Sequence, residues 1–214
     1  GTICQAKNIL FHTDAVQAFL KIDLDVSQLP IDFLSISAHK CYSPKGTGAL
    51  FIRDKATLVP QLKGGPQEIG MRAGTQNTLG IRCFQESIEK LNESKTRLRD
   101  HIQELDSYFL QKISDLEFEN HLLSNEKRTP GFINISFPPI SSEDMILHMD
   151  TNNIAVSAGS ACSTGSLDPS HVLKAMNLPK DVIHSAIRIS LGIQNTKQEI
   201  DSFFSVLNKF ITGI

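Results

Sequence analysis

Two short apolar runs joined by a glycine- and proline-rich turn set the architecture expected for the first half of the chain. Residues 31–38, "IDFLSISA", and 48–53, "GALFIR", have the apolar, β-branched character of buried strands. Residues 44–47, "PKGT", lie between them and indicate a turn. Together with a third strand pattern in residues 9–14, they predict an α/β layer with a mixed sheet.

The rest of the chain alternates between helical and strand patterns. Apolar residues recur at three- and four-residue steps from Leu79 to about Ile113, which predicts a connecting helix, with a break, between two domains. A short helix is also expected in residues 15–22, and the charged stretch 93–106 is expected to be a solvated helix face. Further strands are predicted at 132–137, 154–159 and 186–192, and further helices at 141–153, 169–176 and 196–211.

Composition excludes several classes of partner. The 214 residues are 40% apolar and 21% charged, as is usual for a soluble globular protein. The net charge of -2 and the lack of a basic run give no reason to expect nucleic acid or an anionic membrane as partner. No apolar stretch approaches the roughly 20 residues that span a bilayer.

The cysteines and the first residues also guide interpretation. Cys4, Cys41, Cys83 and Cys162 form no CxxC pair, so neither a zinc site nor a disulfide framework is indicated, and a reducing compartment, the cytoplasm or an organellar matrix, is expected. The chain starts at Gly1 and soon enters the strand-like "NILFHTD". We therefore expect a fragment or one half of a split protein.

Polar side chains stand at the ends of two predicted strands. Asp14 closes the first, and Lys40 follows the second. Ligands collect at strand ends in α/β sheets. A lysine amine can form a Schiff base with the aldehyde of pyridoxal phosphate, and a carboxylate beside the pyridine nitrogen keeps that nitrogen protonated. This pair therefore meets the needs of pyridoxal phosphate.

Three neighbours extend this set. Ser37 and His39 flank Ala38 and so project from one side, where they can bond the phosphate or the ring. Gln17, three residues after Asp14, can reach the ring oxygen.

Other candidates are more ambiguous when taken alone. Cys162 lies in a run of very small residues, "SAGSACSTGS", which suits a mobile nucleophile but also an ordinary loop. Arg188 alternates with apolar residues on a predicted strand and could simply face solvent. In the glycine-rich stretch 64–77, Gln67 and Arg72 are interpreted as structural pins of that loop.

Six blocks, in order, carry a resemblance to a known family: "FHTDAVQ", "SAHKCYSPKGTGALFIR", "GGPQEIGMRAGTQN", "AVSAGSACSTGS", "PSHVLKAM" and "IRISLG". They resemble the cysteine desulfurases of the NifS/IscS group, in the class V aminotransferase family. The resemblance implies a pyridoxal-phosphate enzyme that takes sulfur from L-cysteine and leaves L-alanine and a persulfide. It also implies that residues 1–95 are the C-terminal part of the large cofactor-binding domain of a fold-type I (aspartate aminotransferase-like) enzyme. Residues 96–214 would be a small α+β C-terminal domain carrying the mobile Cys loop.

The resemblance assigns a role to each candidate. Lys40 would be the Schiff-base lysine and Asp14 the partner of the pyridine nitrogen. Arg188 would bind the carboxylate of the substrate, and Cys162 would accept its sulfur. The remaining cofactor-binding residues would be Gln17 at the ring oxygen, Ser37 and His39 at the phosphate, and Thr75 at the phosphate of the other subunit's cofactor in a homodimer.

The first half of the family pattern is absent from this chain, including the loop that cradles the phosphate and the His that stacks on the ring. We therefore expect activity to need an N-terminal half, on the same or a separate chain. A sulfur-acceptor protein, such as an iron–sulfur scaffold, is the expected partner. The alternatives are another class V enzyme, a selenocysteine lyase or an aminotransferase, and a truncated, non-catalytic module for dimerisation or scaffold binding.

Overall fold

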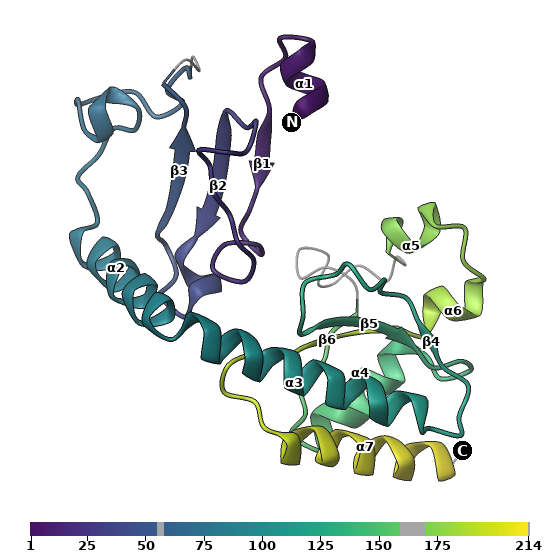
Figure 1. The fold of residues 1–214 in the computed structure, drawn as a ribbon. Helices are drawn as coiled ribbons and strands as arrows, with labels where there is room; N and C mark the ends of the chain where they lie inside the picture. The colour runs from purple at the N-terminus through teal and green to yellow at the C-terminus, as the bar shows by residue number, and fades with distance from the viewer. Residues whose placement is uncertain (55–57, 159–169, 214) are drawn as a thin grey trace. The chain divides into compact units, whose positions relative to one another are not determined.

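The computed structural model describes residues 1–54, 58–158 and 170–213 (Figure 1). The chain divides into two compact units, Gly1–Thr96 and Arg97–Ile214. Each unit is built on its own three-stranded sheet. The assignment of the two units to a cofactor-binding domain and a small domain stays a prediction.

The sheet of the first unit has the strand order β1–β2–β3 (Figure 1). β1 runs parallel to β2, and β3 runs antiparallel to it, so the sheet is mixed as the sequence predicts. The turn between β2 and β3 follows a short 3-10 helix, η1. The elements of this unit are α1 (Thr2–Ala6), β1 (His12–Asp14), β2 (Phe33–Ser37), η1 (Ala38–Cys41), β3 (Gly48–Ile52), η2 (Glu68–Gly70) and α2 (Thr78–Glu93).

The helix expected in residues 15–22 does not form. The chain instead makes a series of turns, in which the carbonyl of Ala15 accepts hydrogen bonds from the N–H groups of Ala18 and Phe19. Leu20 has a φ of 63°, in the left-handed region that a non-glycine residue seldom occupies. A right-handed helix cannot continue through this residue. The N–H of Ile22 also donates to the carbonyl of Ala18, so the one or two helical turns that the sequence predicts are present as single turns without a regular helix.

Two small apolar clusters hold the first unit together. One joins Ala15, Ile31 and Leu34. The other joins Ala38 and Cys41 of η1 to Phe84 of α2. The second cluster fixes η1 against α2, and thereby fixes the lysine that η1 carries.

The sheet of the second unit is antiparallel, in the order β4–β5–β6. The expected break in the long helix is present, since α2 ends at Glu93 and α3 begins at Lys95. In residues 154–158 the structure has only a single bridge, between Ser157 and Arg188, where a strand was predicted. The elements of this unit are α3 (Lys95–Ser114), β4 (His121–Leu122), β5 (Phe132–Ser136), α4 (Ser142–Thr151), α5 (His171–Ala175), α6 (Lys180–His184), β6 (Ala186–Ser190) and α7 (Lys197–Thr212).

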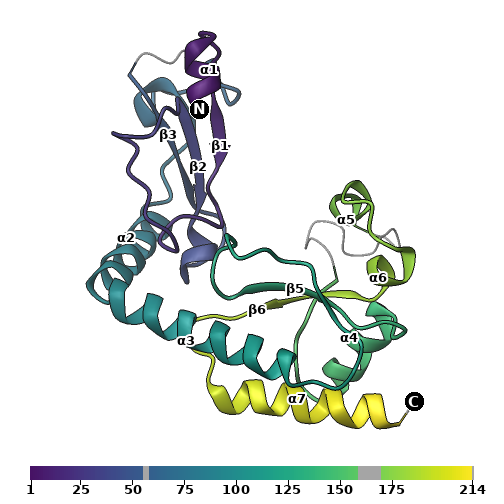
Figure 2. The same ribbon diagram turned by 45° about the vertical axis from the view of Figure 1, so that its right-hand side comes forward.

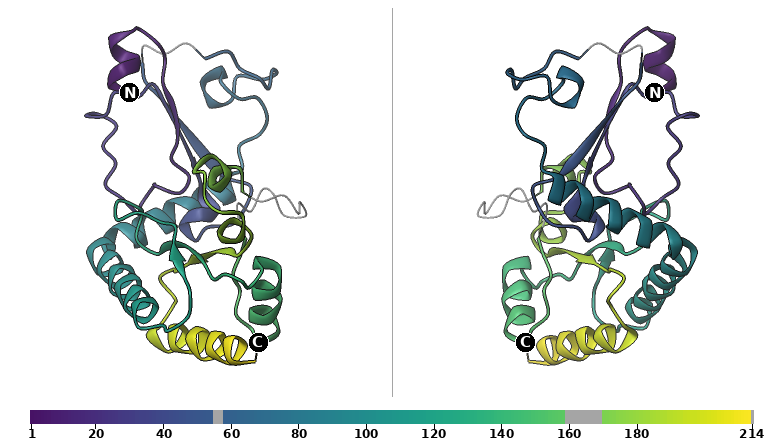
Figure 3. Two further views of the ribbon diagram at one scale, coloured as in Figure 1. Left: turned by 90° about the vertical axis from the view of Figure 1, so that its right-hand side faces the viewer. Right: turned by 90° about the vertical axis from the view of Figure 1, so that its left-hand side faces the viewer.

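Three helices, α3, α4 and α7, build the core of the second unit against one face of its sheet (Figure 2). In Figure 3 the yellow α7 lies between the teal α3 and the green α4. Ile133, Ile135 and Ile187 point from the strands into this core and are fully buried. The rings of Phe109 and Phe204 pack with their centroids 5.1 Å apart.

One charged residue of the expected solvated face of α3 is buried. Asp106 is 3% exposed, and its two carboxylate oxygens accept hydrogen bonds from the guanidinium of Arg128 at 2.8 and 2.7 Å. One of these oxygens also accepts a hydrogen bond from the N–H of Gly131. At Asp106 the prediction of a solvated face was wrong, because its partners lie in a loop more than twenty residues away.

Among the helices of the described ranges, none combines the length and the hydrophobicity that crossing a bilayer demands.

Candidate functional site

The parallel register of β1 and β2 gathers polar side chains on one face of the first sheet. Asp14 pairs with Ser35, and residues two apart on a strand share a face, so His12 joins Asp14 and Ser37 joins Ser35. Nε2 of His12 lies 2.8 Å from Oγ of Ser35, within hydrogen-bonding distance. Leu34, on the opposite face, belongs to the apolar core. The face that carries Asp14 and Ser35 also carries the apolar Phe33, Leu50 and Ile52, so polar and apolar side chains share it, whereas the opposite face packs into the core.

The candidate residues follow the ends of these two strands, which meet at one edge because the strands are parallel. Asp14 is the last residue of β1, and Oδ1 of its carboxylate accepts a hydrogen bond from the N–H of Val16 at 2.9 Å. The N–H of Ala15 donates to the carbonyl of Ser35 at 2.9 Å, which keeps the chain beside β2 beyond the end of β1. The carboxylate of Asp14 is exposed at this edge.

Lys40 sits on η1, directly after β2. Ala38 and Cys41, on the inner side of η1, are buried, whereas His39 is exposed and Lys40 is half-buried. Oγ of Ser37 lies 2.8 Å from Nδ1 of His39, so these two polar groups are already paired. The short helix therefore turns the chain so that a lysine amine and a hydroxyl–imidazole pair stand at the same strand end.

Gln17 lies in the turns that follow β1 and bonds to a second lysine. Nζ of Lys21 donates a hydrogen bond to Oε1 of Gln17 at 2.5 Å. Burial lowers the pKa of the Lys21 ammonium; the nearby Cys41 thiol acts in the opposite direction, and the positive charge of Lys40 lowers this pKa further. Burial raises the pKa of the Cys41 thiol, and Lys21 opposes that rise. The side chain of Lys21 therefore interacts electrostatically with both Lys40 and Cys41.

Thr75 lies in the glycine-rich loop and lines a cavity of about 540 Å³ within the first unit. Oε1 of Gln67 accepts a hydrogen bond from the N–H of Gly74 at 3.2 Å, and the guanidinium of Arg72 donates to the carbonyl of Ala73 at 2.9 Å. Gln67 and Arg72 therefore hold the loop in shape, in keeping with their interpretation as structural pins.

Arg188 belongs to the second unit. It lies on β6 between the buried Ile187 and Ile189, and its register partner on β5 is Asn134. Its side chain therefore leaves the sheet on the face opposite the helices and is half-buried there. Cys162, the proposed sulfur acceptor, lies outside the described residues.

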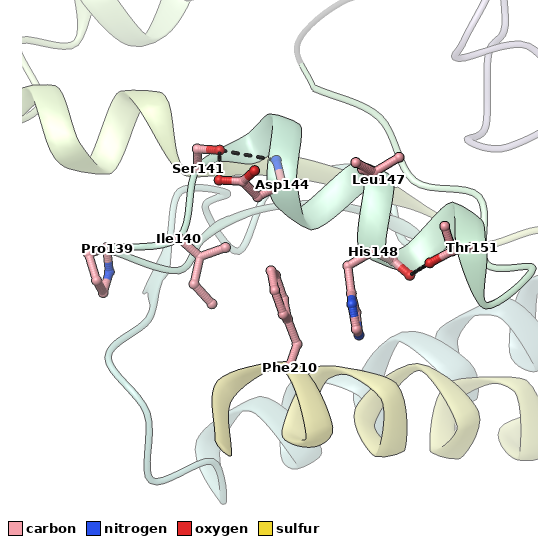
Figure 4. Close-up of a pocket in the computed structure, with 8 residues that line it drawn as sticks. All are labelled: Pro139, Ile140, Ser141, Asp144, Leu147, His148, Thr151 and Phe210. Atoms are coloured by element: carbon pink, nitrogen blue, oxygen red, sulfur yellow. Dashed lines mark hydrogen bonds between the residues drawn. The ribbon is translucent and has the colours of Figure 1, made fainter. Parts of the chain in front are cut away.

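A second cavity, which the sequence did not indicate, lies between α4 and α7 (Figure 4). Its volume is about 580 Å³, and the ring of His148 stacks on Phe210 with the centroids 4.2 Å apart. Ser141 and Asp144, on its rim, bond to each other in the N-terminal cap of α4. These residues serve packing and capping. Its lining is Pro139, Ile140, Ser141, Asp144, Leu147, His148, Thr151 and Phe210.

Comparison with known proteins decides the family. The family model for class V aminotransferases matches residues 1–203. The chain belongs to the class V aminotransferase family. The chain is 41% identical over 215 residues to cysteine desulfurase IscS from Clostridium botulinum, covering 99% of this chain and 54% of that protein. It is 38% identical over 217 residues to the mitosomal cysteine desulfurase of Encephalitozoon cuniculi, covering all of this chain and 49% of that protein.

Solved structures agree with this class V assignment. A NifS-like protein superposes with a TM-score of 0.87 at 32% identity, covering 97% of this chain and 54% of that one. SspA in complex with cysteine gives a TM-score of 0.72 at 33% identity, covering 91% and 54%. The chain therefore has the α/β fold of NifS-like proteins and spans about half the length of the relatives it matches.

Class V aminotransferases use pyridoxal phosphate, and the donor set of the first unit fits that group. The group needs an amine for its aldehyde, an anion for its pyridine nitrogen, and donors for its ring oxygen and phosphate. Lys40 and Asp14 offer the amine and the anion at one sheet edge. Gln17 and the Ser37–His39 pair offer hydrogen bonds beside them.

Proposed function

We propose that this chain supplies the C-terminal part of a pyridoxal-phosphate-dependent cysteine desulfurase. The observation that carries the proposal is the common sheet edge at which Asp14 ends β1 and Lys40 follows β2. The names of the IscS relatives and the solved complex of SspA with cysteine support L-cysteine as the substrate. The products would be L-alanine and a persulfide.

In this proposal the residues of the first unit bind the cofactor. The amine of Lys40 would bond to the aldehyde carbon, and the carboxylate of Asp14 would accept a hydrogen bond from the protonated ring nitrogen. The Ser37–His39 pair would bind the phosphate, and Gln17 would bind the ring oxygen. When bound, the cofactor withdraws electrons from the substrate's Cα and makes its Cβ–S bond labile.

Three residues would act on the substrate itself. The guanidinium of Arg188 would bind the carboxylate of L-cysteine through two parallel hydrogen bonds. The amine of Lys40, once released, would carry protons to and from the substrate carbon. The thiolate of Cys162 would attack the substrate sulfur, so that a new S–S bond forms as the substrate's Cβ–S bond breaks. The product on Cys162 would be a persulfide, ready for a sulfur-acceptor protein.

The exposed apolar surface of the first unit supports the proposed partners. Many large apolar side chains of the first unit are exposed, and Ile69 is 96% exposed, which favours a covering partner such as the N-terminal half of the enzyme. In a homodimer, Thr75 would reach the phosphate of the other subunit's cofactor. An iron–sulfur scaffold is the proposed sulfur acceptor and the cytoplasm the proposed location, although the name of one relative assigns that relative to mitosomes.

Borohydride reduction of the complete enzyme with pyridoxal phosphate tests the cofactor assignment. Reduction makes the bond between lysine and cofactor permanent, and peptide mapping by mass spectrometry then finds the modified residue. We expect the label on Lys40, none in Lys40→Ala, and an unchanged label in the matched variant Lys45→Ala, since Lys45 is an exposed lysine of the turn that follows η1. A label on another lysine would refute the assignment.

The sulfur-transfer step separates a desulfurase from an aminotransferase. In the complete enzyme, Cys162→Ala should reduce alanine formation from L-cysteine by about 100-fold or more, because no thiolate remains to take the sulfur. Cys83→Ala, on α2, is the control and should retain the original rate. If Cys162→Ala kept full turnover, Cys162 would not be the sulfur acceptor, and another class V activity would replace the desulfurase in this proposal.

A further inference from the structure

The amide of Gln17 has its orientation set by its neighbour. The side-chain bond joins Nζ of Lys21 to Oε1 of Gln17 at 2.5 Å. A lysine ammonium has three N–H donors and no acceptor, and within a glutamine amide only the oxygen accepts. Whichever way such an amide is first assigned, the charged lysine requires its oxygen. The NH₂ group of Gln17 is therefore turned away from Lys21.

The fold holds Lys21 in this position. Its backbone N–H donates to the carbonyl of Ala18 at 3.0 Å, and Leu20, just before it, has the left-handed φ of 63° that redirects the chain. Lys21 is half-buried, whereas Gln17 is exposed. Because Lys21 is half-buried and its backbone is hydrogen-bonded, its side chain has less freedom to move than that of a fully exposed lysine. Lys21 is thus the more constrained member of the pair.

Lys21 also belongs to the surroundings of the cofactor-binding lysine. Lys40 and Cys41, both on η1, are two ionisable groups of the described residues that act on Lys21. Burial and the charge of Lys40 lower the pKa of Lys21, and Cys41 opposes them. Its charge and its hydrogen bond therefore both act where the proposed cofactor would bind.

We propose that Lys21 is a positioning residue, which turns the amide of Gln17 so that its NH₂ group faces the ring oxygen of pyridoxal phosphate. The inference rests on the proposed function. The ring oxygen carries negative charge, so a donated N–H stabilises it, while an amide oxygen in the same place would repel it. Lys21 touches neither cofactor nor substrate in this role and acts through Gln17.

The first test needs no cofactor. Side-chain amide resonances of Gln17 are compared by ¹⁵N NMR in the unchanged protein, in Lys21→Met and in Lys21→Arg. Methionine keeps the apolar stem and removes the donor, whereas arginine keeps a group that only donates. We expect the Gln17 resonances to move to the values of a freely solvated amide in Lys21→Met and to stay near their original values in Lys21→Arg. Unchanged resonances in Lys21→Met would overturn the inference.

The second test uses the complete enzyme with pyridoxal phosphate and follows the visible absorbance of the bound cofactor against pH. Lys21→Met should raise the pH midpoint of that absorbance by about one unit, because the amide of Gln17 is then no longer held with its NH₂ group toward the ring oxygen. Lys21→Arg, which keeps a donor at this position, should leave the midpoint at its value in the unchanged enzyme. The matched control is Lys45→Met, an exposed lysine after η1, which should leave the midpoint where it was.

A double-mutant cycle separates the hydrogen bond from the mere charge of Lys21. If Lys21 acts through Gln17, Lys21→Met should shift the midpoint little in a Gln17→Ala background. Additive shifts would overturn the inference. Where Lys21→Met does not fold, Lys21→Leu, which also lacks a donor, takes its place in both tests with the same expected results. Failure of the proposed function looks different, since the unchanged enzyme would then carry no cofactor on Lys40.

Discussion

The two units differ in how much of their apolar surface they bury. In the second, fifteen buried apolar residues form one continuous core, whereas the first has two clusters of three. Of the seventeen large apolar side chains exposed in the described part of the chain, thirteen belong to the first unit. The second unit therefore has one large core of its own, whereas the first leaves more of its large apolar side chains exposed.

The difference has a structural origin. In the second unit three amphipathic helices cover one face of the sheet, and α7 alone contributes Ile200, Phe203, Phe204 and Leu207 to the core. In the first unit α2 packs against η1 through Phe84. The face of the first sheet that carries Asp14 and Ser35 is the one on which the candidate site begins. The first unit thus contains most of the candidate site residues but buries less apolar surface than the second.

Hydrogen exchange should show the largest effect of this difference. In the 214-residue chain, the amides of β1, β2 and β3 should exchange at least about 100-fold faster than those of β5, β6 and α7, because local opening costs less where little apolar surface is buried. Exchange measured by mass spectrometry on peptides from each unit checks this. Equal protection in the two units would contradict the comparison.

A matched pair of leucines sharpens the comparison energetically. Leu105 is 2% exposed in the large core and Leu34 is 5% exposed in a cluster of three. Leu105→Ala should cost about 4 kcal/mol and Leu34→Ala about 2 kcal/mol, because the smaller cluster collapses more readily around the lost side chain. Urea denaturation followed by circular dichroism measures both. Equal costs would mean that the first unit packs as firmly as the second.

Sequence reasoning succeeded where a signal is local. Strand patterns predicted β2, β3, β5 and β6, and the helical pattern in residues 196–211 predicted α7. The polar residues at the ends of the first two strands were found in the same way, since strand ends can be recognised from the apolar run before them. Parallel pairing places the end of β1, at Asp14, on the same side of the sheet as the end of β2, after which η1 carries Lys40.

Sequence reasoning failed where a feature depends on residues far apart in the chain or on an unusual backbone conformation. Asp106 is buried because Arg128 and Gly131 surround its carboxylate, and no spacing within α3 reveals partners in a remote loop. The bond between Lys21 and Gln17 lies in a stretch where Leu20 has a left-handed backbone conformation, which its apolar side chain does not predict. The stack of His148 on Phe210 joins residues far apart in the chain.

The smallest expected effects come from the helix caps, one in each unit. Thr196 and Glu199 form a capping box on α7, and Oδ1 of Asn77 accepts a hydrogen bond from the N–H of Gly80 at the start of α2. Thr196→Ala should lower the free energy of unfolding of the second unit by about 1 kcal/mol. Asn77→Ala should leave that transition unmoved and loosen only the first unit. The two variants are compared by urea denaturation with exchange in α2 and α7 as the local readout.

The carboxylate of Glu199 makes the stability of the α7 cap depend on pH, whereas the uncharged Asn77 gives the α2 cap no such dependence. The N–H of Thr196 and the side-chain amide of Asn195 hold the pKa of the Glu199 carboxyl below its ordinary value. A carboxyl with a lowered pKa in the folded state stabilises that state above its unfolded pKa, about 4.3, and loses this contribution as the pH falls through the folded pKa. Glu199→Gln keeps an acceptor but not the charge, so its stability deficit at pH 7 should shrink below about pH 4. A deficit that stayed constant down to pH 3 would mean that the cap works without the charge, and that the caps of the two units are alike.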